Sequence, residues 1–154
     1  MKLFELDKFE NFQCFIEKTL LDVTNSSSVN IFFVNQAKKV LIKVKDHNIF
    51  EENPWDLGII GEVARTGQPI SATNAQGHSR FNPLVDFKAN SPIHTYPIKG
   101  SEGVIIAVVQ ILKFHDMLGR KLKKDQNEED ILWKLLMCLG IFYEKMRDQL
   151  KFLK

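Results

Sequence analysis

The sequence lacks most of the features that mark disulfide-bonded, secreted or membrane-spanning proteins. It contains only two cysteines, Cys14 and Cys138, which are too few for a disulfide framework. Their apolar neighbours in predicted helices indicate buried, reduced thiols. No apolar run reaches the length of a membrane span, and the charged N-terminal segment has no signal-peptide core. We therefore expect a cytoplasmic protein with no membrane partner.

An excess of one charge is also missing. The chain has 21 Lys and Arg residues against 19 Asp and Glu residues, so its formal net charge is +2. The basic run Arg120–Lys124 has no interleaved aromatic residues, which favours a solvated loop and no nucleic-acid partner. The four histidines are scattered without metal-ligand spacing, so we expect no metal site.

The chain does contain enough apolar residues for one core. Its 154 residues, 44% of them hydrophobic, are sufficient for one domain over residues 1–154 and too few for two. Apolar residues recur at helical spacing from Leu6 to Val23 and predict an N-terminal helix, which the polar segment Thr24–Ser28 ends. Asn127, as an N-cap followed by acidic residues, predicts the start of a long C-terminal helix.

The apolar residues of the C-terminal helix recur in steps of three and four, which describes one narrow seam. We expect the first half of this seam to pack on the protein's own sheet. Beyond Met146 the helix is expected to extend past the domain, and a homodimer or a partner helix is our hypothesis for that part. The seam consists of Leu132, Leu135, Leu139, Phe142, Met146 and Leu150.

Between the two helices the pattern is that of strands. Val29–Val34 and Val40–Val44, joined by a polar turn, predict one antiparallel hairpin. Ile93–Ile98 and Val104–Leu112, joined by the turn Lys99–Gly103, predict a second. The last strand is apolar on both faces, so it should lie in the middle of a sheet that is covered on both sides. Helices at both ends with antiparallel strands between them indicate an α+β fold.

The segment Gly58–Asn82 carries the most information. Asp56 is a candidate N-cap for a helix whose apolar residues share one face. Gly67 ends that helix, because glycine adopts the left-handed conformation of a C-cap without steric cost. Pro69 cannot continue a helix, so Gln68–Thr73 is predicted to leave as a strand.

Three motifs between Gly58 and Gln110 resemble those of GAF domains, the small-ligand sensor modules of cyclic-nucleotide phosphodiesterases, adenylyl cyclases and many signalling proteins. GIIGEVARTGQPI is similar to the family's helix-to-strand signature, SRFNPLVD to its phosphodiesterase-type loop, and HTYPIKGSEGVIIAVVQ to its paired central strands. The resemblance implies the GAF fold, with about six antiparallel strands, the terminal helices on one face and a lidded ligand pocket on the other.

The likeness to the phosphodiesterase and cyclase type makes a cyclic nucleotide the candidate ligand. Such a ligand needs backbone amides for its phosphate, an apolar contact for its ring and acceptors for its base. By resemblance, the candidate ligand-binding residues are Asp46, Ala64, Arg65, Phe81, Asp86, Phe87 and Gln110. The structural alternatives are that Phe81 anchors its loop and Asp86 caps the next turn. We expect Asp86→Ala to reduce the ligand response more than stability, and Phe81→Ala to reduce stability.

Other activities of the family fit the residues less well. Methionine sulfoxide reduction and bilin attachment need a cysteine in the loops over the pocket, and the loops between Asn53 and Ile93 contain none. No nucleophile with a nearby base can be assembled from the pocket segments, so we expect no enzyme.

The nucleotide-binding motif itself is degenerate. The central strand continues after Gln110 with Ile-Leu-Lys-Phe where binders have Asn-Lys, and Lys88–Pro92 is short and lacks the expected threonines. Two hypotheses therefore remain open. The chain is either a regulatory domain that senses a small molecule, or a ligand-free GAF fold that serves as a structural or protein-interaction module in a larger assembly.

Overall fold

The computed structural model describes residues 3–45, 49–88, 91–113 and 126–147. Its elements are, in chain order, α1 (Leu3–Thr24), β1 (Ser28–Asn35), β2 (Val40–Lys45), β3 (Ile49–Pro54), α2 (Gly58–Thr66), β4 (Ile70–Ala72), the 3₁₀ turn η1 (Ala75–Gly77), β5 (Ile93–Lys99), β6 (Ile105–Leu112) and α3 (Gln126–Met146).

The strands form one six-stranded antiparallel sheet in the order β3-β2-β1-β6-β5-β4. Both predicted hairpins are confirmed, β1 with β2 and β5 with β6. β6 lies between β1 and β5, which confirms the central position that its continuous apolar sequence predicts. The described part of the chain thus has the α+β architecture expected from its sequence.

Two strands differ from the sequence prediction. β3 was not predicted, because its sequence Ile-Phe-Glu-Glu-Asn-Pro has no alternating pattern. β4 is shorter than the predicted strand Gln68–Thr73. Its three residues pair only with Ile93, His94 and Thr95 of β5. The second half of β5, which includes Pro97, is paired with β6 alone among the described strands.

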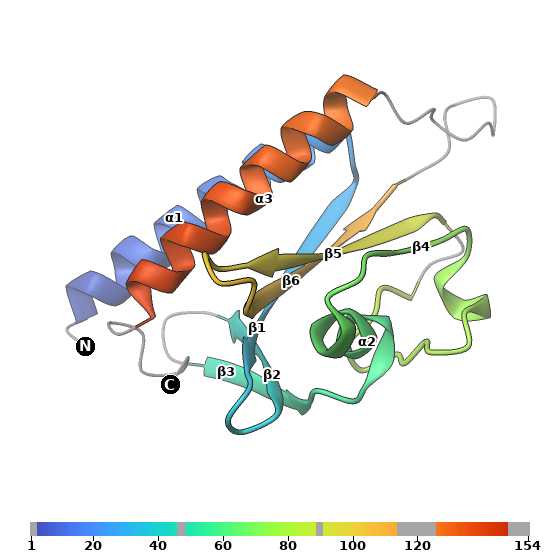
Figure 1. Cartoon of the computed structure of the whole chain (residues 1–154), viewed down its shortest axis with the longest axis horizontal. Helices are drawn as coiled ribbons and strands as arrows, with labels where there is room; N and C mark the ends of the chain where they lie inside the picture. The colour runs from blue at the N-terminus through green and yellow to red at the C-terminus, as the bar shows by residue number, and fades with distance from the viewer. Residues whose placement is uncertain (1–2, 46–48, 89–90, 114–125, 148–154) are drawn as a thin grey trace.

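The two faces of the sheet are covered by different helices. Helices α1 and α3 lie side by side on one face, and α2 lies on the other (Figure 1). Under the terminal helices, Phe9, Leu20 and Tyr143 are buried in an aromatic-rich core. The rings of Phe12 and Phe142 join the two helices at a centroid distance of 4.3 Å.

The opposite face has a second core under α2. Its buried residues come from β1, β2, β6, α2 and the loop that follows η1, and they are Phe32, Val34, Leu41, Ile60, Val63, Ala64, Val85 and Val108. The terminal helices and α2 therefore each cover one face of the central strands, as the apolar sequence of β6 requires.

The terminal helices differ from prediction in two details. Cys14 and Cys138 lie on α1 and α3 as predicted, but both are exposed, so the prediction of buried thiols is wrong. Helical rotation instead turns Ile16 and Leu139 inward. Asn127 lies inside α3, whose described part begins at Gln126, so it is not the N-cap.

The predicted seam of α3 faces the protein itself. Leu132 and Leu139 are buried, and Leu135, Phe142 and Met146 are partly buried against the same core. Leu150, like the run Arg120–Lys124, lies outside the described residues. Within the ranges that the structure describes, none of the helices combines the length and the apolar sequence needed to span a bilayer.

Candidate functional site

The N-terminal end of α2 is held by a residue that lies far along the chain. The N-cap position is Leu57, and no side chain caps the helix from there, so the prediction that Asp56 is the cap is wrong. Instead, Asp86 accepts hydrogen bonds from the backbone N–H groups of Ile59 (2.9 Å) and Ile60 (3.2 Å). A carboxylate at this end also complements the helix dipole. The loop that contains Asp86 thus replaces a local cap.

The glycine at the start of α2 makes this contact sterically possible. Gly58 has a φ of +75°, and a Cβ there would lie 2.4 Å from Val85 Cγ2 and 2.7 Å from Asp86 Oδ2. Any side chain at this position would push the loop away from the helix. Glycine therefore permits both the backbone conformation and the close approach of Asp86.

Asp86 also belongs to a buried polar network that reaches the centre of the sheet. Its carboxylate accepts hydrogen bonds from the backbone N–H of Asn82 (2.9 Å) and from Nε2 of Gln110 (3.1 Å). Nε2 of Gln110 donates to Thr95 Oγ1 as well, and its Oε1 accepts from the backbone N–H of Phe87 (2.9 Å). Three predicted site residues are thus brought together, with the protein's own groups as their partners.

The ring of Phe87 and the remaining predicted site residues have separate surroundings. Phe81 and Phe87 are partly buried and pack against a small core formed by Ile59, Ala75, Ile93 and Leu112. Ala64 is buried in the core under α2. Asp46 lies outside the described residues.

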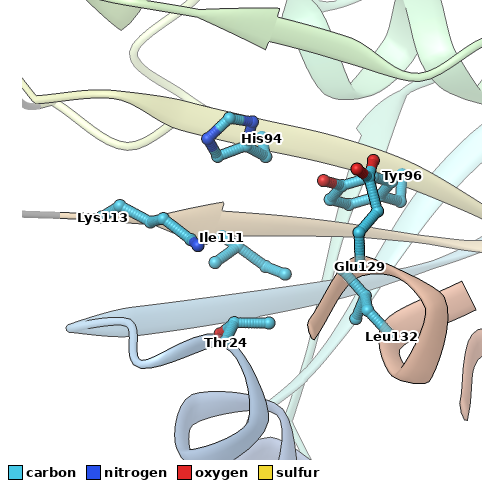
Figure 2. Close-up of a pocket in the computed structure, with 7 residues that line it drawn as sticks. All are labelled: Thr24, His94, Tyr96, Ile111, Lys113, Glu129 and Leu132. Carbon is cyan, nitrogen blue, oxygen red and sulfur yellow. The ribbon is translucent and has the colours of Figure 1, made fainter. Parts of the chain in front are cut away.

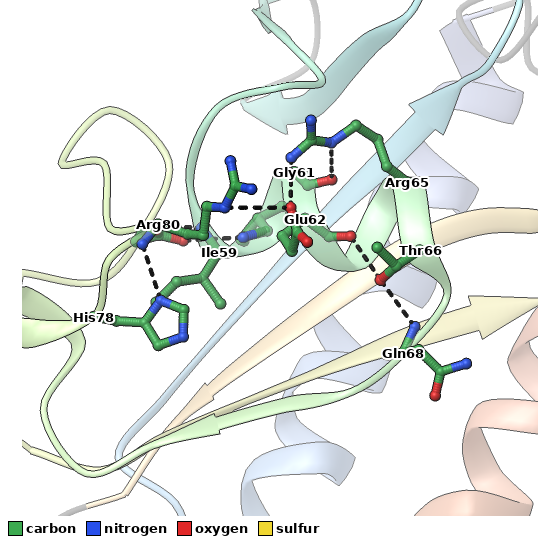
Figure 3. Close-up of polar contacts among 10 residues, drawn as sticks. Ile59, Gly61, Glu62, Arg65, Thr66, Gln68, His78 and Arg80 are labelled. Carbon is green, nitrogen blue, oxygen red and sulfur yellow. Dashed lines mark hydrogen bonds and ion pairs between the residues drawn. The ribbon is translucent and has the colours of Figure 1, made fainter.

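Arg65 lies on the exposed side of α2, in a cluster of charged residues (Figure 3). Its Nη2 is 2.7 Å from Glu62 Oε2, and Arg80 Nε approaches the same oxygen at 3.6 Å. The backbone N–H of Arg80 donates to His78 Nδ1 at 3.1 Å. These contacts fasten the loop after η1 to the outer surface of α2, and they lie on the solvent side of the helix.

Asn53 is a candidate that the sequence did not reveal. It lies in β3 opposite Leu41, whose side chain belongs to the core under α2. Its Nδ2 is buried and has no hydrogen-bond partner among the described residues. An unpaired buried donor costs about 1–3 kcal/mol, so such a group needs a polar partner beyond the described residues, which a water or a ligand can supply. No sequence signal could have found it, since β3 itself was not predicted.

A small hollow lies on the opposite face of the sheet, next to the terminal helices (Figure 2). It measures about 240 Å³ including its opening to solvent, and its lining residues are Thr24, His94, Tyr96, Ile111, Lys113, Glu129 and Leu132. Beside it, Ser71 Oγ and His94 Nδ1 form a cross-strand hydrogen bond of 2.7 Å. This hollow is separate from the site expected under α2. Over the described ranges, no group of three or more His, Cys, Asp or Glu side chains could hold a metal ion.

No family model matches the sequence. A dual 3′,5′-cyclic-AMP and -GMP phosphodiesterase of Drosophila melanogaster is 41% identical over 69 residues, which are 42% of this chain and 5% of that protein. A probable 3′,5′-cyclic phosphodiesterase of Caenorhabditis elegans is 31% identical over 97 residues, covering 61% of this chain and 13% of the relative. The chain thus spans only a small part of the curated relatives that it matches.

Solved structures extend the likeness to nearly the whole chain. The GAF domain of a phosphoenolpyruvate-protein phosphotransferase from Coxiella burnetii covers 96% of this chain and 93% of its own, with a TM-score of 0.66 and 13% identity. The free methionine-R-sulfoxide reductase of Neisseria meningitidis covers 87% of this chain and 77% of its own, with a TM-score of 0.61 and 15% identity. These likenesses establish the fold, and they include both a GAF domain of a larger protein and an enzyme.

Proposed function

Because the chain has the fold of a GAF domain, as its motifs predicted, we propose that it is a non-catalytic regulatory domain that senses a small molecule in signalling. The observation that carries this proposal is the likeness, at 31–41% identity, to segments of cyclic-nucleotide phosphodiesterases. The matched segments are only a small part of each of those proteins, so the likeness supports a shared module and not a shared activity.

We place the ligand on the α2 face of the sheet, beneath the loop of residues 81–88. Side chains of the core fill the space under α2, whereas a ligand site needs roughly 300 Å³ or more. A ligand must therefore move the loop, which takes Val85 out of the core under α2, and the partly buried Phe81 and Phe87 are loop side chains that lie outside that core. Their rings would then contact a planar base.

Asn53 offers a further polar group on the α2 face, in the edge strand β3. Its unpaired Nδ2 sits in the strand beside the core under α2 and can donate a hydrogen bond to an acceptor on the ligand. A cyclic nucleotide offers such acceptors on both its base and its phosphate. Gln110 is proposed to shape the site from behind, whereas Asp86, whose hydrogen bonds hold the loop to α2, is proposed to move with the loop.

The contacts of the reactive side chains support a non-catalytic role. Cys14 and Cys138 lie on the helices that cover the opposite face, so neither thiol belongs to the loops around α2. Ser71 and His94 form a nucleophile–base pair in geometry, but they join the short edge strand β4 to β5 beside the other hollow. Their hydrogen bond serves to hold that strand.

The test is the thermal unfolding of the whole chain with and without cyclic GMP or cyclic AMP, with native mass spectrometry to detect bound ligand. A hundredfold excess over the dissociation constant stabilises the native state by about 2.7 kcal/mol, which raises the unfolding temperature measurably. An unchanged unfolding temperature with both nucleotides, together with an unliganded native mass, would reject cyclic-nucleotide sensing.

Asn53→Leu gives this test a specific variant. Removing an unpaired buried donor should leave stability unchanged or higher, while the nucleotide-dependent shift is lost. Asn35→Leu is the matched control, because Asn35 is buried and its Oδ1 accepts a hydrogen bond from the backbone N–H of Lys38. This control should be less stable than wild type, and its unfolding temperature should still rise when the nucleotide is added. If Asn53→Leu keeps the full nucleotide-dependent shift in unfolding temperature, Asn53 does not contact the ligand.

A second candidate function is a ligand-free module that acts through its surface. The observation that favours it is a set of exposed apolar side chains on the terminal helices, where Phe15 is 63%, Ile131 53% and Ile141 44% exposed. Exposed apolar residues on neighbouring helices are typical of protein contacts. A monodisperse monomer at high concentration would count against self-association through this surface.

A further inference from the structure

Lys99, the last residue of β5, contacts helices on both faces of the sheet. Its side chain passes over Gly67, the residue that ends α2: a Cβ on Gly67 would lie 3.4 Å from Lys99 Cε and 3.5 Å from Nζ. On the other face, a Cβ on Gly140 of α3 would lie 1.8 Å from the carbonyl oxygen of Lys99. One residue thus connects the helix of the candidate site with a terminal helix.

The contact between Lys99 and α3 leaves little room for the two to move relative to each other. The backbones of Lys99 and Gly140 approach so closely that no side chain fits between them. One turn further along α3, Glu144 accepts hydrogen bonds from the backbone N–H (3.0 Å) and the hydroxyl (3.1 Å) of Ser101. Because α3 is attached to this hairpin at two successive turns, a displacement of Lys99 moves α3 with it or breaks these contacts.

Lys99 contacts α2 at its C-terminal end, which carries the negative end of the helix dipole. Gly67 has a φ of +71° and its N–H closes the helix on Val63 O. The ammonium of Lys99 therefore lies where a cation is favoured by the helix dipole. Ile105 of β6 packs beside it, since a Cβ on Gly67 would lie 3.2 Å from Ile105 Cδ1.

The alternation of side chains along β5, together with the close approach of its backbone to α3, explains why one residue can serve both faces. Pairing between β5 and β6 is regular up to Ile98, which lies opposite Ala107, and then shifts so that Lys99 lies opposite Ile105. The extra residue of this bulge is Ile106 of β6, and β5 keeps its alternation, with Ile98 and Lys99 on opposite faces. Ile98 still belongs to the core under the terminal helices, whereas the side chain of Lys99 lies on the side of α2.

We propose that Lys99 is the link through which a change at α2 reaches α3. The part of the proposal that concerns a ligand rests on the proposed function. A ligand that moves the loop of residues 81–88 withdraws Asp86 from the start of α2, the helix shifts at its other end against Lys99, and the backbone of Lys99 carries α3 with it. Occupancy of one face is thereby read out at the terminal helix on the other.

The link can be tested without a ligand, by hydrogen exchange of the whole chain. Gly67→Ala places a methyl group 3.2 Å from Ile105 Cδ1 and in contact with Lys99 Cε at 3.4 Å, and a side chain in the left-handed conformation shifts a local equilibrium by about fivefold or more. The expected result is that the backbone amides of α3 near Gly140 exchange up to about fivefold faster, while those of β2 and β3 are unchanged. In a Lys99→Ala background the same substitution should leave α3 unaffected.

Gly103→Ala is the matched control. Gly103 has a similar φ of +78°, but a Cβ there meets no atom within 4 Å, so the variant carries the backbone strain without the contact. Lys99→Met, which keeps the stem and removes the charge, should preserve the response if packing transmits it. Equal effects of Gly67→Ala and Gly103→Ala on α3, or a response that persists in Lys99→Ala, would overturn the link. Failure of nucleotide binding would reject the proposed function and leave this result standing.

Discussion

Gln110 donates a hydrogen bond from Nε2 to Oδ1 of Asp86 at 3.1 Å, and this bond joins the central strand β6 to the loop that holds the start of α2. Both residues were predicted from sequence to contact a ligand. Their polar atoms are instead engaged by the protein, which changes the consequences expected for their substitution.

Asp86→Ala should destabilise the fold, contrary to the expectation from sequence. The substitution leaves the N–H groups of Ile59, Ile60 and Asn82 without their acceptor, and the expected loss is about 2–4 kcal/mol of unfolding free energy. Denaturant unfolding measures it. Asp56→Ala is the control, because Asp56 is exposed and caps nothing, so its effect should stay within about 0.5 kcal/mol. Similar losses in the two variants would contradict the assignment of Asp86 as the cap.

Gly140→Ala should be among the most damaging single substitutions in α3. The added methyl group would lie 1.8 Å from the carbonyl oxygen of Lys99, so the helix must move away from the sheet, at a cost of about 3 kcal/mol or more. Gly77→Ala provides the comparison, because a Cβ at Gly77 meets nothing within 4 Å. Calorimetry should show a large fall in unfolding temperature for the first and little change for the second.

Glu144 should make the stability of the protein sensitive to acid. Hydrogen bonds from the backbone N–H and then the hydroxyl of Ser101 hold the pKa of Glu144 below its ordinary value of 4.5. A carboxyl group with a lowered folded-state pKa contributes stability above the unfolded pKa and loses it as pH falls through the folded pKa. Wild type should therefore lose more stability than Glu144→Gln when the pH falls below about 4.5. Thermal unfolding across this range tests the prediction, and parallel curves would contradict it.

A second copy of the chain is our expectation for the exposed apolar side chains of α1 and α3. Sedimentation should show a dimer that Phe15→Glu or Ile141→Glu converts to monomer, because either variant places a charge in the contact. Val104→Glu is the control, since Val104 is 38% exposed and lies outside the terminal helices. If all three variants leave the mass unchanged, self-association does not use this surface.

Most of the fold could be predicted because its signals are local. Gly67 and Pro69 specify the end of α2 with their own backbone preferences, and the apolar run of β6 specifies a strand with two covered faces. Each of these depends on a few consecutive residues. The length of β4 was overestimated because strand ends are set by pairing, and β4 pairs with only part of β5.

The candidate site could not be predicted to the same extent, since its contacts join residues distant in sequence. Asp86 caps a helix that begins 28 positions earlier in the numbering, at Gly58, and only the folded loop brings the two together. Asp56 stood in the right place for a local cap and was therefore preferred. The unpaired amide of Asn53 is a property of the packed state alone, for which no sequence pattern exists.

The brevity of β4 leaves the second half of β5 on the border of the sheet, and the residues found there limit what can attach to it. Pro97 has no N–H to offer to an incoming strand, and Lys99 places a charge at the end of the border. A foreign chain cannot extend a continuous ladder along this edge. The same short stretch that connects the two faces of the sheet thereby opposes strand addition at this edge.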